Sequence, residues 1–118
     1  MPNTSSASVR IFWLDRAAVL QELESAARQL KAIHPEIEQV LLFGSLARNQ
    51  GVPGSDADLL LILSASNATF LERIPRYLPE GLSVGVDVFP YTRTEISSML
   101  DRGNPFIRQA LKDGILLA

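Results

Sequence analysis

The spacing of hydrophobic residues predicts where the first helix lies. After Asp15, apolar residues recur every three or four positions, which is typical of an amphipathic helix packed against a sheet. Asp15 is a suitable N-cap, and His34-Pro35 is expected to end the helix, because a residue that precedes proline avoids the helical conformation. The periodic apolar positions are Val19, Leu20, Leu23, Ala27 and Leu30.

Three stretches are predicted to be strands. Residues 37–43 and 57–63 are rich in apolar residues, and the second is apolar almost throughout, as a central strand buried on both faces should be. Residues 83–89 alternate between two kinds of side chain, which predicts a strand with two different faces. One face would carry Val84, Val86 and Val88, and the other would carry Gly85, Asp87 and Phe89.

Capping signals predict two helices near the end of the chain. Thr92 and Glu95 have the T-x-x-E spacing of a capping box, so a helix is expected to begin there and to end at Gly103. Asn104-Pro105 places a capping side chain before a proline at the first helical position. This last helix is expected to end at Gly114.

The remaining segments carry weaker signals. Asn67 is the expected N-cap of a helix between the second and third strands. Val9–Leu14 could be a short strand or a docking segment, and Met1–Ser8 is expected to be a frayed end. Because Ile11–Leu14 and Ile115–Leu117 are apolar, both are candidate interface segments, and a homo- or hetero-oligomer is possible.

Composition limits the class of protein. The 118 residues contain no internal repeat or linker, so a single domain over 1–118 is expected. There is no cysteine, which excludes disulfides and thiolate metal sites and is compatible with a cytoplasmic protein. The net charge of −2 argues against binding of extended nucleic acid, which requires clustered Lys and Arg. No apolar run approaches the roughly eighteen residues that a membrane span requires.

The segment between the first two strands carries the candidate chemistry. Asp56 and Asp58 are two residues apart at the start of a strand, so both side chains are expected on one face. Two adjacent carboxylates repel each other unless a divalent cation lies between them, and Mg²⁺ prefers oxygen ligands of this kind. Gly44 would let a phosphate approach the backbone, and Ser45 could cap a helix beginning at residues 46–49, whose N–H groups would favour an anion.

Asp87 and Arg48 complete the candidate set, and each has an alternative interpretation. A carboxylate between valines in a strand is costly unless it is paired, hydrogen-bonded or bound to a metal. Asp87 could instead be an edge-strand charge that discourages pairing between sheets. Arg48 adds a positive charge near the turn, or is an ordinary solvated arginine. Gly44-Ser45 by itself could be an ordinary turn.

The spacing of these residues resembles a known family. Gly44-Ser45, ten further residues and then Asp56-Ala57-Asp58 match the G-S-x10-D-x-D signature of the DNA polymerase beta-type nucleotidyltransferase superfamily. The longer string G-S-L-A-R…S-D-A-D-L is similar to its smallest members, the minimal nucleotidyltransferase (MNT) domains. The resemblance implies an α+β fold, in which a small mixed β-sheet resembling the polymerase beta palm is flanked by α-helices.

The resemblance also implies roles for the candidate residues. Asp56, Asp58 and Asp87 would be catalytic and would ligate two Mg²⁺ ions, with Asp87 on the side of the acceptor hydroxyl. Gly44 and Ser45 would hold the β- and γ-phosphates of ATP, and Arg48 would add a counter-charge. The implied reaction transfers AMP from ATP to a hydroxyl group.

The implied biology is that of a toxin–antitoxin pair. MNT domains are typically encoded beside a small helical HEPN-domain toxin, and the resemblance implies that this chain is the antitoxin that adenylylates a tyrosine of that partner. One alternative is a non-catalytic antitoxin that neutralises its partner by occlusion alone. Another is a small-molecule nucleotidyltransferase that modifies antibiotics. Sugar transferases also use a D-x-D motif, but their domains are much larger than this chain.

Other residues with chemical potential have ordinary explanations. His34 is the only histidine and is expected to interact with the C-terminal end of the first helix. The aromatic residues are expected in the core or at an interface rather than stacked on bases. Tyr91 is the aromatic residue nearest the end of the strand that carries Asp87.

Overall fold

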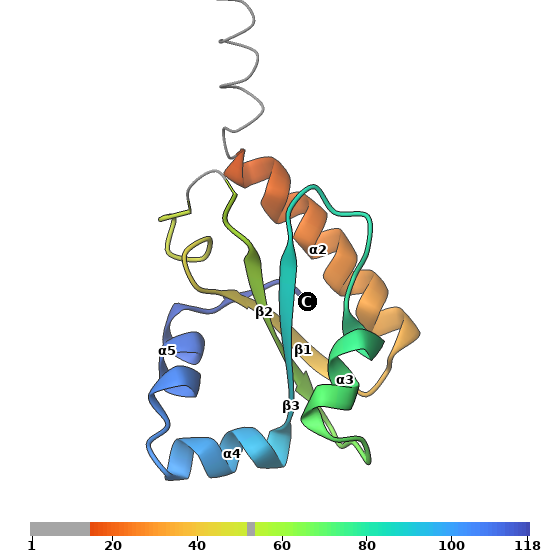
Figure 1. Cartoon of the computed structure of the whole chain (residues 1–118), viewed down its shortest axis with the longest axis vertical. Coiled ribbons are helices and arrows are strands. Elements are labelled where there is room, and N and C mark those ends of the chain that lie inside the picture. Colours follow the sequence, from red (N-terminus) through yellow and green to blue (C-terminus); the bar gives the residue numbers. More distant parts are fainter. Residues whose placement is uncertain (1–14, 52–53) are drawn as a thin grey trace, which may run out of the picture.

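The computed structural model describes residues 15–51 and 54–118, which form a four-stranded mixed sheet with helices on both faces (Figure 1). The sheet order is β3-β2-β1-β4, in which β1 pairs antiparallel with β2 and β4, while β2 and β3 are parallel. The strands are β1 (Ile37–Phe43), β2 (Ala57–Leu63), β3 (Val86–Thr92) and β4 (Ile115–Leu116). The predicted α+β class is confirmed.

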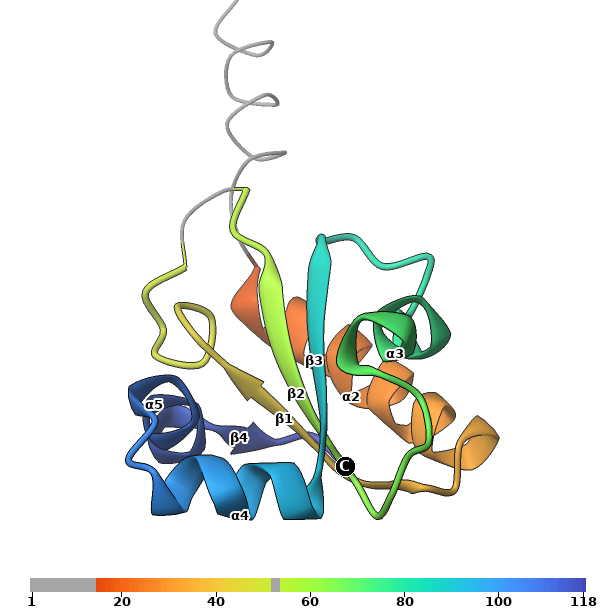
Figure 2. The same ribbon diagram turned by 60° about the horizontal axis from the view of Figure 1, so that its bottom comes forward.

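In the described residues, four helices cover the sheet. They are α2 (Arg16–Ile33), α3 (Phe70–Tyr77), α4 (Arg93–Asp101) and α5 (Pro105–Asp113). Figure 2 shows α2 and α3 on one face of the sheet and α4 and α5 on the other. None of the helices in the described parts of the chain is both long and apolar enough to cross a membrane.

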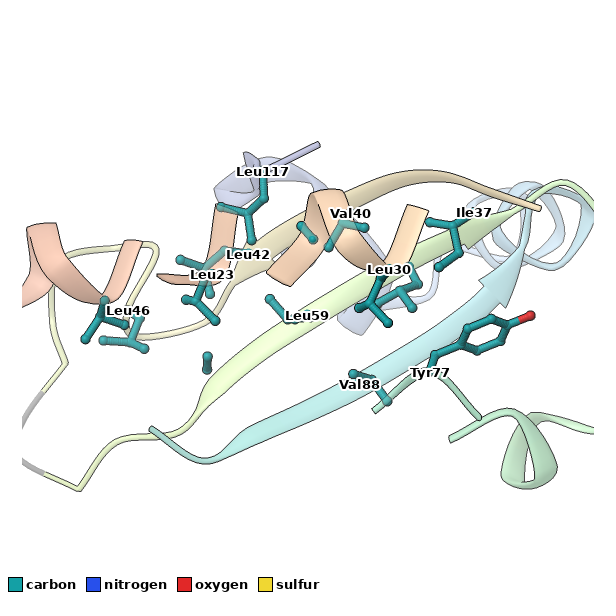
Figure 3. Close-up of a cluster of buried hydrophobic side chains, with 14 of the residues drawn as sticks. Leu23, Leu30, Ile37, Val40, Leu42, Leu46, Leu59, Tyr77, Val88 and Leu117 are labelled. Carbon is teal, nitrogen blue, oxygen red and sulfur yellow. The ribbon is translucent and has the colours of Figure 1, made fainter. Parts of the chain in front are cut away.

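The sheet separates two hydrophobic clusters, so β2 is buried on both faces as predicted. Leu59 belongs to the cluster under α2, where it lies among side chains from α2, β1 and β3 (Figure 3). Leu60, its neighbour, points to the opposite cluster with Ile96 of α4 and Ile107 of α5. Both leucines are fully buried. The core therefore holds β2 rigidly from two sides, and β2 carries the candidate aspartate Asp58.

Most local signals were interpreted correctly. The bounds of β1 and β2 agree with the predicted ranges. Asp15 caps α2 by accepting a hydrogen bond from the N–H of Ala18, and the backbone N–H of His34 ends the helix by donating to the carbonyl of Leu30. Thr92 and Glu95 form the predicted capping box. The helix after Asn104 begins with proline, as predicted.

The predicted bounds of two elements were wrong. The N-cap of α3 is Thr69 rather than Asn67, because Thr69 and Glu72 satisfy each other's backbone N–H groups in a second capping box. The third strand covers Val86–Thr92 instead of 83–89. Ser83, where the strand was predicted to begin, lies outside the ladder, and both its N–H and its hydroxyl donate to the Glu22 carboxylate on α2.

The ends of the chain give mixed outcomes. Ile115–Leu117, predicted to be a short apolar tail, closes the edge of the sheet through β4 and buries Leu117 in the main core. The role of this segment as an interface stays a prediction. Leu116 alone in this segment is largely exposed, at 58%. The predictions for Met1–Ser8 and for Val9–Leu14, with its candidate interface Ile11–Leu14, lie outside the described residues.

Candidate active site

The predicted site residues gather where three strands meet at one end of the sheet. The turn after β1 carries Gly44 and Ser45, and β2 and β3 begin at the same end of the sheet, with β2 between β1 and β3 (Figure 2). The antiparallel register of β1 and β2 places Phe43 opposite Asp58. The parallel register of β2 and β3 places Asp58 opposite Asp87. Asp58 and Asp87, which are 29 positions apart in the sequence, are thus brought side by side.

Strand alternation puts Asp58 and Asp87 on the same face of the sheet. Asp58 is in phase with Leu60, and Asp87 is in phase with Phe89. Leu60 and Phe89 both belong to the hydrophobic cluster under α4 and α5, so the two carboxylates continue that face toward the sheet end. Asp58 is half-buried, whereas Asp87 is exposed.

The exposure of Asp87 corrects one part of the sequence argument. Asp87 is the second residue of β3 rather than a mid-strand residue, and its exposed side chain pays no burial penalty. The argument from the cost of a buried charge therefore does not apply to it. Strand β3 is an edge of the sheet, which is where a protective charge would also be found. A role for Asp87 in the candidate active site is favoured instead by its position opposite Asp58.

Glycines make room for two of the three carboxylates. Gly44 has a φ of 80°, and a Cβ at this position would overlap the Oδ2 atom of Asp58. A Cβ at Gly85 would in the same way overlap the Oδ1 atom of Asp56. Gly85 was not identified from the sequence as a site residue, although a glycine inside an alternating strand pattern is a signal of close approach.

The carboxylate of Asp58 lies in an environment that disfavours its charge. Burial raises the pKa of Asp58, and the negative charges of Asp87 and then Asp56 raise it further, while Arg48 lowers it. Asp87 and Asp56 are thus both near enough to Asp58 to act on its charge. A divalent cation would relieve the same repulsion.

The turn that follows Gly44 is not the beginning of a helix, which corrects the prediction for residues 46–49. It is a single helical turn in which the N–H of Arg48 donates to the carbonyl of Gly44 at 3.1 Å. The N–H of Gln50 then closes the turn on the carbonyl of Ser45 at 2.8 Å, and Asn49 has a φ of 58°. The predicted anion site therefore has no helix N-terminus behind it, and only the backbone N–H groups of this one turn could bind an anion there.

Arg48 is held by side chains around the turn. Its Nε donates to Gln50 at 3.0 Å, and its Nη1 donates to Asp113 at the end of α5 at 3.1 Å. Hydrogen bonds from Gln109 and then from Arg48 lower the pKa of Asp113. Arg48 is therefore paired rather than simply solvated, and its charge still reaches Asp58.

Arg16 is a functional candidate that the sequence analysis missed. Its guanidinium donates from Nε to the carbonyl of Leu46 at 3.0 Å and from Nη2 to the carbonyl of Ala47 at 3.2 Å. The first residue of α2 is thus bound to the turn after Gly44-Ser45, thirty positions later. No local signal predicts a contact of this range.

The donor chemistry fits magnesium, but the side chains do not form a finished ligand set. Carboxylate oxygens from Asp56, Asp58 and Asp87 are the hard ligands that Mg²⁺ takes. Within residues 15–51 and 54–118, however, no three His, Asp or Glu side chains are arranged to hold a metal ion. The assignment of these three aspartates as metal ligands stays a prediction.

The other candidates from the sequence lie away from the carboxylates. His34 contacts Tyr77 edge to face, with ring centroids 4.9 Å apart, at the end of α2, as expected for a residue at a helix end. Tyr91 stacks on Phe70 at 4.6 Å. A groove of about 830 Å³ runs along α2 and residues 78–82, but none of the three aspartates lines it.

Comparison with known proteins identifies the family. Residues 23–117 match the sequence profile of the nucleotidyltransferase domain. The chain belongs to the nucleotidyltransferase domain family. No curated protein matches its sequence significantly. A solved structure described as "a putative nucleotidyltransferase from Sulfolobus solfataricus" is 22% identical with a TM-score of 0.59, over 86% of this chain and 80% of that one, and supports the fold alone.

The contact between Gly44 and Asp58 predicts an unequal cost for two glycine substitutions in this nucleotidyltransferase domain. Gly44→Ala adds both a strained positive φ, which costs on the order of 1–3 kcal/mol, and an overlap with Asp58. Gly103→Ala is the matched control, because its φ is 71° but nothing lies within 4 Å of the added Cβ. Urea unfolding should show the larger loss for Gly44→Ala, and equal losses would contradict the contact.

The raised pKa of Asp58 predicts how stability depends on pH. Above the raised pKa the folded domain must carry the disfavoured charge, whereas below the unfolded value of 3.8 the carboxyl is neutral in both states. Asp58→Asn should therefore be more stable than the wild type at pH 7 without divalent metal, and this advantage should disappear as the pH falls toward 4. Urea unfolding of both proteins across this range measures the difference. A constant difference at all pH values would refute the assigned cause.

Proposed function

We propose that this chain is a Mg²⁺-dependent nucleotidyltransferase that transfers AMP from ATP to a hydroxyl group. The observation that carries the proposal is the parallel register that sets Asp58 opposite Asp87, with Asp56 close enough to raise the pKa of Asp58. Clustered carboxylates beside a glycine turn are suited to a nucleotide triphosphate bound through metal. Membership of the nucleotidyltransferase domain family supports the same class of reaction.

In the proposed reaction the acceptor hydroxyl oxygen attacks the α-phosphorus of ATP. A new P–O bond forms to the acceptor, the bond from the α-phosphorus to its bridging oxygen breaks, and pyrophosphate leaves. Asp87, being exposed at the sheet end, takes the hydroxyl proton. Gly44 and Ser45 hold the β- and γ-phosphates at the turn, and Arg48 adds positive charge on the same side.

Magnesium would be held by the three aspartates. When bound, it would supply charge neutralisation at the triphosphate and would make the acceptor hydroxyl easier to deprotonate. The chain's own contribution is to present Asp58 on a strand that is buried from both faces, so that its backbone position does not shift when ligands arrive. Glycines at 44 and 85 leave space beside the carboxylates of Asp58 and Asp56.

For the acceptor, we propose a tyrosine of a small helical HEPN-domain toxin, so that the chain acts as an antitoxin in the cytoplasm. This assignment rests on the resemblance of G-S-L-A-R…S-D-A-D-L to the MNT domains. A non-catalytic antitoxin remains the main alternative, since it would need the fold but not the carboxylates. A small-molecule nucleotidyltransferase is the second alternative.

Nucleotide binding tests the site without any acceptor. Thermal unfolding of the wild type should shift upward with Mg²⁺ and one of ATP, GTP, CTP or UTP, and ATP is expected to act most strongly. A ligand at a hundred times its dissociation constant adds about 2.7 kcal/mol to the stability of the folded state. Asp56→Asn should lose the metal-dependent part of the shift, whereas Asp101→Asn, an exposed aspartate on α4, should keep it. No shift with any nucleotide would overturn the proposed reaction.

Label transfer tests the acceptor. With a HEPN-domain protein encoded beside this chain, ATP labelled at the α-phosphate should label the partner, and ATP labelled at the γ-phosphate should not. Asp58→Asn should abolish labelling, and Asp101→Asn should leave it unchanged. If Asp58→Asn still neutralises the toxin in cells, neutralisation is by occlusion. Labelling of an aminoglycoside in place of the protein would favour the small-molecule enzyme.

A further inference from the structure

Arg16 occupies a position that does not favour its own helix. It is the first residue of α2, where the helix dipole presents its positive end, and the first turn contains no acidic residue. A cation at this end of a helix is electrostatically unfavourable. The helix itself therefore gives no reason for an arginine here, and its role must be sought in what the side chain contacts.

The side chain contacts two consecutive carbonyls of the turn after Gly44-Ser45. Nε donates to Leu46 at 3.0 Å and Nη2 donates to Ala47 at 3.2 Å, and both hydrogen bonds are partly buried. A guanidinium presents donors in a fixed planar arrangement, so two bonds fix the orientation of the acceptors as well as their distance. The two bonds join the start of α2 to this turn.

Because a peptide unit is planar, the contact of Arg16 with a carbonyl also fixes the direction of the N–H group in the same peptide. The carbonyl of Leu46 and the N–H of Ala47 belong to one planar peptide and point in opposite directions. By holding the carbonyl, Arg16 turns the N–H of Ala47 away from α2. The next peptide is fixed in the same way, because the N–H of Arg48 donates to the carbonyl of Gly44 at 3.1 Å. The N–H of Ala47 is thus turned to the side opposite Arg16.

The charge of Arg16 adds to this effect. Within residues 15–51 and 54–118, no carboxylate lies within ion-pair distance of Arg16. Arg73 is a useful comparison, because it also donates to two carbonyls, those of Ala68 and Pro90, but is neutralised by Glu95. Arg16 therefore offsets the partial negative charge of the two carbonyls and leaves a positive potential behind the turn.

We propose that Arg16 is a positioning residue for the triphosphate: it acts through the carbonyls of Leu46 and Ala47 to orient the phosphate-binding turn. The inference rests on the proposed nucleotidyltransferase function and adds to it a residue outside the G-S and D-x-D strings. Because Arg16 acts on the turn rather than on the carboxylates, its loss weakens the binding of phosphates and leaves the nucleoside contacts unchanged.

Calorimetric titration with Mg²⁺ tests this role with two probes, ATP and inorganic tripolyphosphate. Arg16→Met should weaken the binding of both by the same factor, about tenfold, which corresponds to about 1.4 kcal/mol. Arg16→Lys keeps the charge but not the two-pronged geometry, so its affinity should lie between those of Arg16→Met and the wild type. Measuring well below each melting temperature separates binding from stability.

The controls distinguish this inference from the proposed function. Arg73→Lys, which changes a buried arginine that also binds carbonyls, should lower the melting temperature and leave the affinities for ATP and tripolyphosphate unchanged. If Arg73→Lys does not fold, Arg93→Lys at the exposed start of α4 is the control in its place. Wild-type affinity in both Arg16 variants would overturn the inference and leave the proposed function standing. Loss of ATP binding alone, with tripolyphosphate binding retained, would also overturn it. If the wild type binds neither probe, the proposed function fails first.

Discussion

The parallel pairing of β2 with β3 is the constraint on which the candidate site depends. It begins where the N–H of Ala57 donates to the carbonyl of Gly85 at 2.8 Å, and from there the register sets Asp58 beside Asp87. A shift by one residue would turn Asp87 to the opposite face of the sheet. The hydrophobic clusters on the two faces of the sheet exclude such a shift, since Val88 packs in one of them and Phe89, its neighbour on β3, packs against the other.

This arrangement places like charges close together, and the surrounding structure accommodates them locally. Gly44 and Gly85 leave space for the carboxylates of Asp58 and Asp56, and the backbone of Gly44 takes a positive φ that other residues rarely adopt. Arg48, held by Asp113, supplies a positive charge that lowers the pKa of Asp58. The site is thus built at a cost in electrostatic energy that a bound cation would offset, which is the usual compromise of a functional site.

Two arginines connect elements that are distant in the sequence. Arg73 is 4% exposed and joins α3 to β3 and α4, because it donates to the carbonyl of Pro90 and to both carboxylate oxygens of Glu95. Its hydrogen bonds lower the pKa of Glu95, which also closes the capping box of α4. Arg16 makes the corresponding link between α2 and the turn at residues 46 and 47. Neither contact has a sequence signal, because both depend on how separate elements pack.

The sequence by itself determined the features whose physics is local. Apolar periodicity located α2, β1 and β2, capping residues located α4 and α5, and the spacing from Gly44 to Asp58 indicated the family. Tertiary structure decided what depends on distant partners. Ser83 bonds to Glu22 outside β3, and Ile115–Leu116 became an edge strand by pairing with β1. Packing placed Gly85 beside Asp56 and Arg16 against the turn at residues 46 and 47. Hydrogen bonds and close contacts between residues far apart in the sequence produce no periodic pattern. Each of the two residues could have many different neighbours, so neither one alone predicts the contact.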